Sequence, residues 1–165
     1  MDTNTNTDDD IDHMLSACER NDLDMVQALA TDKGEATLPA GFLTACAHNH
    51  LELAKWIHTR KPMNVLSPDN NAVLMALTHG SLDVLRWLVD DLGVDINAAD
   101  NIQLVYASMR GHLPVVQWIW DRKGEVTQAQ KDLALERATT FGKAEVAAWW
   151  RSHGANSVTA VALTE

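Results

Sequence analysis

Positive charge and long apolar segments are both scarce in this 165-residue chain. Its 13 Lys and Arg residues are outnumbered by 23 Asp and Glu residues, and the net charge of −10 opposes direct binding to nucleic acid or to an anionic membrane surface. No apolar run is long enough to cross a bilayer. Residues 1–10 are polar and acidic, unlike a secretory signal, so we expect a disordered leader and a cytoplasmic (intracellular) protein.

Motifs for catalysis are also missing. The sequence has no nucleophile elbow and no glycine cluster that could cradle a phosphate, which predicts a protein that is not an enzyme and has no cofactor. The pair His48 and His50, with His79 further along the chain, offers a ligand type that zinc accepts. No cysteine or carboxylate recurs with these histidines, so we expect no metal site.

A tandem repeat is the main feature that the sequence does contain. Four tryptophans stand 31 residues apart in succession: Trp56, Trp87, Trp118 and Trp149. The segments around them superimpose without gaps, and a fifth copy begins at Asn21 and carries Ala28 where the others carry tryptophan. Because the tryptophans lie beside Ile or Leu in an apolar pattern of helical spacing, we expect them in the core. The chain is therefore an array of one structural unit.

Each copy carries the pattern of two helices joined by a tight turn. An alanine recurs four residues before a Gly or Asn, at Ala17, Ala45, Ala76, Ala107 and Ala138. The small alanine lets a second helix approach closely, and Gly or Asn most readily adopts the left-handed backbone that ends a helix. An acidic residue or proline three positions later suits the start of a second helix. Such short pairs bury their apolar faces only by stacking, which predicts an all-α solenoid.

The repeats resemble the ankyrin family. The closest match is the segment from Ala76 to Leu88, with its alanine-to-glycine helical turn, followed by the loop Gly93-Val94-Asp95-Ile96-Asn97-Ala98. The family's Thr-Pro-Leu-His opening is absent, and a period of 31 is slightly short for it, while a tetratricopeptide array fits the spacing less well. The resemblance covers residues 11–156 and implies a leader at 1–10, five ankyrin-like repeats and a tail at 157–165. The expected repeat bounds are 11–38, 39–69, 70–100, 101–131 and 132–156.

The two cysteines, Cys18 and Cys46, occupy the same slot in successive copies. Equivalent positions in stacked helices lie about 8–10 Å apart, whereas a disulfide needs its Cα atoms within about 7 Å. We therefore expect both cysteines to be reduced and buried as small hydrophobic side chains.

The resemblance also implies a binding surface on the concave face, formed by the loop tips and the ends of the first helices. The residue before each turn is in succession Arg20, His48, His79, Arg110 and Phe141. This row of cationic or protonatable groups ending in an aromatic predicts an acidic or polar peptide as partner, with Arg110 and Phe141 as the strongest contacts. Alternatively, the row is a set of solvated helix ends. Four further candidates are Met109, the loop residues Asn70 and Asn101, and Trp120, which falls off the apolar stripe and is expected to be partly exposed.

These features predict a monomeric, non-catalytic protein–protein interaction module that acts as an adaptor, scaffold or inhibitor. Two alternatives stay open. The acidic chain could act as a decoy that occupies a basic nucleic-acid-binding protein, or it could be a host-directed effector of a microbe or virus. Whether residues 1–165 are a whole protein or part of a longer array also stays open.

Overall fold

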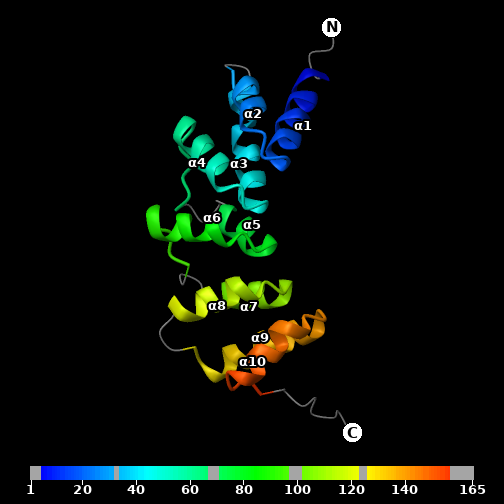
Figure 1. The fold of residues 1–165 in the computed structure, drawn as a ribbon, viewed down its shortest axis with the longest axis vertical. Coiled ribbons are helices and arrows are strands. Elements are labelled where there is room, and N and C mark those ends of the chain that lie inside the picture. Colours follow the sequence, from blue (N-terminus) through cyan, green and yellow to red (C-terminus); the bar gives the residue numbers. More distant parts are fainter. Residues whose placement is uncertain (1–4, 32–33, 67–70, 97–101, 123–125, 157–165) are drawn as a thin grey trace. The chain divides into compact units, whose positions relative to one another are not determined.

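Paired helices form the framework of the protein. The computed structural model describes residues 5–31, 34–66, 71–96, 102–122 and 126–156, and this part of the chain is helical with no β-strand. The first helices of the repeats are α1 (Thr5–Glu19), α3 (Leu38–Ala47), α5 (Ala72–His79), α7 (Ile102–Arg110) and α9 (Gln128–Thr140) (Figure 1). The second helices are α2 (Leu23–Leu29), α4 (Leu51–Arg60), α6 (Leu82–Arg86), α8 (Leu113–Arg122) and α10 (Ala144–Ser152). A 3-10 turn, η1 (Gly34–Thr37), precedes α3, and a π-helical turn, η2 (Trp87–Asp91), continues α6. The expected all-α repeat fold is confirmed.

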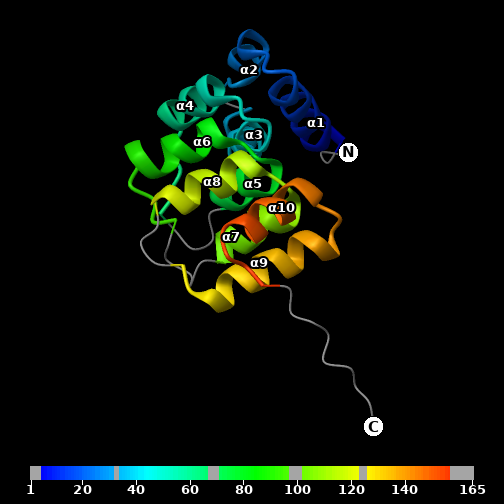
Figure 2. The same ribbon diagram turned by 60° about the horizontal axis from the view of Figure 1, so that its bottom comes forward.

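The chain divides into two compact units, residues 1–94 and 95–165. In the first unit, α1 packs on α3 and α3 packs on α5, while each second helix packs on the first helix of its own repeat. In the second unit, α7 and α9 pack side by side, with α8 against α7 and α10 against α9 (Figure 2). First helices of successive repeats therefore pack directly on one another within each unit.

The turn inside each repeat has the left-handed backbone that its sequence predicts. The φ angle is +56° at Asn21 and +58° at Asn49, and it lies between +68° and +87° at the three glycines, which are Gly80, Gly111 and Gly142. The second helix of each repeat begins two residues after this position. A positive φ is sterically costly for most residues, but Gly and Asn adopt it readily. A Gly or Asn at this position therefore ends the first helix, and the second helix begins two residues later.

The five alanines one turn before these positions are confirmed as packing sites. Each of them, from Ala17 in α1 to Ala138 in α9, has 0 % of its surface exposed. A methyl side chain at these buried positions leaves room for close contact between helices within each unit. The apolar residues three positions earlier complete the stripe in most repeats, since Met14, Phe42 and Leu104 are also buried.

The periodic tryptophans are only partly core residues. Trp87 and Trp118 are buried, but Trp56 and Trp149 are half-buried. The next residue along each second helix lies deeper, with 0 % exposure at Ile57, Leu88, Ile119 and Trp150. The prediction that all four repeating indoles are core residues is therefore too simple, because the helix turns by 100° per residue and places the following side chain at the centre of the packed face.

Helix α1 begins earlier than the sequence suggested. Residues 5–10 are helical, so the expectation of a disordered leader over residues 1–10 does not hold for them. Residues 1–4 and the tail at 157–165 lie outside the described part of the chain. None of the described helices has the length and apolar character needed to span a membrane.

Both cysteines are free and buried, as expected from their place in the repeat. Burial raises the pKa of the Cys18 thiol to about 11 and that of the Cys46 thiol to about 12. A Cβ atom at Gly41 of α3 would stand 2.9 Å from the Cys18 Sγ atom, which shows how tightly this thiol is packed between α1 and α3. Because the thiolate is the nucleophilic form, burial of this kind disfavours thiol reactivity, and both cysteines serve as packing groups.

Asn49 joins two repeats in addition to forming a turn. Its Oδ1 atom accepts hydrogen bonds from the backbone N–H groups of Asp83, at 3.1 Å, and Val84, at 3.2 Å, and its Nδ2 atom donates to the Asp83 carboxylate at 3.0 Å. Those N–H groups belong to the first turn of α6 and have no partner within that helix. Ser81, which stands at the cap position, instead donates its hydroxyl to the Ala47 carbonyl at 2.7 Å. The turn of one repeat therefore caps a helix of the next.

We expect Asn49→Gly to lower the free energy of unfolding by about 1 kcal/mol, because it keeps the positive φ but removes the cap from α6. Urea denaturation followed by far-UV circular dichroism measures the change. The matched control is Asn21→Gly. Asn21 has nearly the same φ, and its side chain makes no hydrogen bond within the described residues. Equal losses in the two variants would contradict the capping role of Asn49.

Candidate functional site

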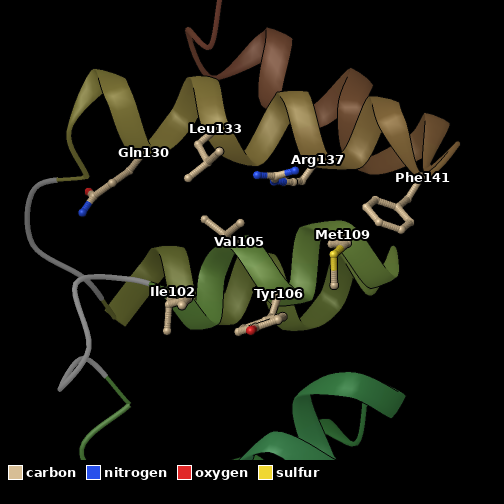
Figure 3. Close-up of a pocket in the computed structure, with 8 residues that line it drawn as sticks. All are labelled: Ile102, Val105, Tyr106, Met109, Gln130, Leu133, Arg137 and Phe141. Carbon is tan, nitrogen blue, oxygen red and sulfur yellow. The ribbon is translucent and has the colours of Figure 1, made fainter.

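An open groove runs between α7 and α9. It encloses a hollow of about 700 Å3, within the size range of ligand-binding sites in proteins. Eight side chains line it: Ile102, Val105, Tyr106 and Met109 from α7, Gln130, Leu133 and Arg137 from α9, and Phe141 directly after α9 (Figure 3).

Helical spacing brings these side chains to the groove. Leu133, Arg137 and Phe141 follow one another at intervals of four residues, so they form a single row along α9 and its C-terminal end. Ile102, Tyr106 and Met109 form the matching row on α7, with Val105 pointing toward α9 (Figure 3). The core residues of α7, such as Leu104 and Ala107, lie at other positions and are fully buried. Helix α7 is thus apolar on its groove face as well as on its core face.

Exposed hydrophobic surface is concentrated in this groove. Ile102 is 48 % exposed, Tyr106 and Leu133 are each 38 % exposed, and Phe141 is 53 % exposed. These four are among only seven large hydrophobic residues that are exposed in the described part of the chain. A contiguous apolar patch on a protein surface marks an interaction site more often than scattered single residues do.

Charge differs between the two units. Fifteen of the 23 acidic residues but only six of the 13 basic residues fall within residues 1–94, which gives this unit a formal charge of −9. Residues 95–165 hold eight acidic and seven basic residues, a formal charge of −1.

Arg137 is the one charged residue among the eight that line the groove. It forms no ion pair within the described residues. The groove therefore combines an apolar surface with one arginine that has no ion-pair partner within the described residues.

Two of the residues expected at the binding surface lie in this groove. Met109 and Phe141 line it, whereas Arg110 is exposed at the end of α7 and is not a lining residue. Arg20, His48 and His79 are exposed as well, but they belong to the first unit. The loop candidates, Asn70 and Asn101, lie outside the described residues.

The histidines of the first unit form a small cluster. The ring centroids of His48 and His50 are 5.8 Å apart, and those of His48 and His79 are 6.3 Å apart. One nitrogen of each ring is within hydrogen-bond distance of a backbone carbonyl: His48 with Thr44, His79 with Met75 and His50 with Glu19. In the described residues, no group of three His, Cys, Asp or Glu side chains is placed to hold a metal ion.

Trp120 belongs to an aromatic cluster of α8 and α10 and does not line the groove. Its ring centroid lies 5.5 Å from that of Trp149, 5.6 Å from that of Trp150 and 5.6 Å from that of His153, each with the rings edge to face. The Lys131 ammonium lies 5.2 Å from the centroid of the same indole. The side chain is half-buried, and its aromatic neighbours account for the burial.

Several groove residues were not predicted from the sequence: Ile102, Val105, Tyr106, Gln130, Leu133 and Arg137. A signal for some of them is present. Ile102 and Tyr106 are large apolar residues at helix positions that the repeating core pattern does not require. A helix with more large apolar residues than its core face needs has a second apolar face, which is either buried or used for binding. Arg137 lines the groove only because α9 packs against α7. The apolar pattern of a single helix does not show which helix will pack beside it.

Comparison with known proteins identifies the repeats. A family model described as ankyrin repeats in three copies matches residues 13–100, and no curated protein matches the chain. Residues 102–156 carry the same helix–turn–helix geometry, with left-handed glycines at Gly111 and Gly142. Ankyrin repeats are generally protein–protein interaction modules, and the family is typically non-catalytic. The match spans more than half of the sequence, and the chain belongs to the ankyrin-repeat family.

Proposed function

We propose that this chain is a non-catalytic protein-interaction module that binds a segment of another protein in the groove between α7 and α9. The observation that carries the proposal is the gathering of four of the seven exposed large hydrophobic residues in that one groove. Covering apolar surface contributes about 25 cal/mol per Å2, and two rows of large side chains on helices offer such surface.

The same groove has the composition of a binding site for polypeptide. Aromatic residues and methionine are enriched at protein interfaces, and Tyr106, Met109 and Phe141 supply them here. A single arginine on the groove wall adds a polar contact that can fix the orientation of the partner. These residues support a role as an adaptor or inhibitor that acts by binding its partner, without catalysis.

Selection from a random peptide library tests the proposal. Peptides displayed on phage are selected on the purified full chain, and their affinities are measured by fluorescence polarisation. We expect Leu133→Glu to weaken groove-binding peptides by about tenfold or more, because it places a charge in an apolar contact. Leu74→Glu is the matched control, since Leu74 is 40 % exposed on the first helix of another repeat and Leu133 is 38 % exposed.

The outcome of the selection is decisive in either direction. Peptides that lose affinity with Leu133→Glu but keep it with Leu74→Glu support the groove as the binding surface. A selection that yields no peptide, or only peptides that bind both variants equally well, overturns the proposal. Chemical shift changes of the Met109 methyl group on binding give a second, independent location of the peptide.

A second candidate function is favoured by the charge of the first unit. The formal charge of −9 over residues 1–94 would attract a basic protein, and the chain would then act as a decoy for a nucleic-acid-binding partner. Competition between this chain and double-stranded DNA for one basic protein separates the two functions. Groove-dependent binding should be insensitive to added DNA, whereas decoy binding should be lost.

A further inference from the structure

We infer that the partner segment carries an acidic residue between two apolar residues, and that its carboxylate pairs with Arg137. This inference rests on the proposed function, because it specifies the chemistry of the segment that the groove receives. The spacing follows from the helix: Leu133, Arg137 and Phe141 are each one turn apart, or roughly 6 Å along α9. The partner's apolar, acidic and apolar groups should recur at a similar interval.

The charge of the groove comes from a single side chain. The eight lining residues include one cation and no carboxylate. Within the described residues Arg137 forms no ion pair, although the protein as a whole is acidic. An arginine without a carboxylate of its own is suited to bind one from a partner, because its guanidinium can donate two parallel hydrogen bonds to a carboxylate.

Apolar side chains lie around Arg137 in the groove. Figure 3 shows its side chain between those of Leu133 and Phe141, with Val105 and Met109 opposite on α7. A bound peptide with apolar side chains on both sides of its carboxylate would cover this site from water. Partial exclusion of water strengthens an ion pair between groups that are well aligned. The position of the cation inside an apolar row therefore favours a mixed segment over a purely acidic one.

The two apolar ends of the groove differ in the side chains that they accept. At one end Ile102, Val105 and Leu133 offer branched aliphatic surface, which suits a leucine or isoleucine of the partner. At the other end Phe141, Tyr106 and Met109 offer two aromatic rings and a flexible thioether, which can adapt to an aromatic side chain. A polar residue, Gln130, lies at the aliphatic end of the groove (Figure 3).

Nucleic acid is a poorer fit to the same groove. Nucleic-acid sites combine several cations that follow the phosphate backbone, and here one arginine stands alone among the lining residues. The formal charge of residues 95–165 is −1, which supplies no general attraction for phosphate. The chemistry of the groove therefore favours a polypeptide with one carboxylate.

A charge-swap experiment on the full chain tests the inference. Groove-dependent peptides are selected separately on the unmodified protein and on Arg137→Glu, and their sequences are compared. We expect Asp or Glu at one fixed position between two apolar residues on the unmodified protein, and Lys or Arg at that position on Arg137→Glu. Replacing the selected acidic residue by its amide should weaken binding to the unmodified protein by about tenfold. Arg151→Glu is the control, since Arg151 is an exposed arginine of α10 that does not line the groove.

Failure of the inference is distinguishable from failure of the proposed function. Peptides that depend on Leu133 but show no acidic preference, or show the same preference on Arg137→Glu, overturn the inference and leave the groove as a binding surface. Absence of any peptide that depends on Leu133 overturns both. A synthetic peptide of residues 157–165 that binds the groove as tightly as the selected peptides would make a segment of this chain the occupant, and it would overturn the assignment of an outside partner.

Discussion

Replacing Trp150 with alanine should lower the free energy of unfolding of the second unit by about 3–5 kcal/mol. The indole is 0 % exposed and is one of the largest fully buried side chains among the described residues. Its Nε1 atom donates a hydrogen bond to the Ser108 hydroxyl at 2.8 Å, and that hydroxyl donates to the Leu104 carbonyl at 2.8 Å. The substitution therefore leaves a large cavity and also breaks a buried link between α10 and α7.

Denaturation by urea, followed by far-UV circular dichroism, measures this loss without relying on the fluorescence of the removed indole. Hydrogen exchange over residues 102–156 then shows whether the loss is confined to the second unit, as expected for repeats that are stabilised mainly by their neighbours. The control is Trp120→Ala, which removes a half-buried indole from the same aromatic cluster and should cost much less. Equal losses at the two positions would mean that burial does not determine the effect.

The turns and the helix contacts were predictable because they depend on one residue at a time. A positive φ favours Gly or Asn wherever it occurs, and a Gly or Asn that recurs four residues after an alanine places the five turns along the chain. A close helix contact favours a side chain no larger than a methyl group, and the recurring alanines, such as Ala76, identify that contact. Each of these requirements is local, and repetition makes it visible.

The depth of the aromatic side chains was not predictable in the same way. Trp149 and Trp150 are adjacent, and the 31-residue period selects the first of them as the core residue. The structure buries the second completely and leaves the first half-buried. In the three other repeats that carry tryptophan, the fully buried position holds Ile57, Leu88 or Ile119. A periodic residue type marks a position in the repeat, but the direction of the side chain decides how deeply it is buried.

The candidate site shows a similar limit. Met109 and Phe141 were expected at the surface because they stand near the ends of first helices, and they do line the groove. The apolar rows of the groove were missed because side chains of α7, such as Val105, and side chains of α9, such as Leu133, come together only when α9 lies against α7. A prediction from the residue before each turn treats the five repeats as equal. The distribution of exposed hydrophobic residues shows that the fourth and fifth repeats differ from the rest.

In the first unit, we expect Trp87→Ala to cost about 3–5 kcal/mol in the free energy of unfolding. Trp87 is 7 % exposed, and its ring meets those of Phe42 and His58 edge to face, with centroids 6.3 Å and 5.7 Å away. Phe42 lies on α3 and His58 on α4, so this indole joins the second helix of one repeat to both helices of the repeat before it. Its loss removes packing from the contact between repeats, where the stability of such arrays resides.

Trp56→Ala separates this explanation from a general effect of removing tryptophan. Trp56 stands at the same position of the preceding repeat but is half-buried, so its removal should leave a smaller cavity and cost less than that of Trp87. Urea denaturation of both variants gives the comparison, and the slope of the transition gives a second result. Because Trp87→Ala weakens the coupling between repeats, its transition should broaden as well as shift, whereas the Trp56→Ala transition should only shift. A shift without broadening for Trp87→Ala would show that the indole fills space within its repeat without coupling the repeats.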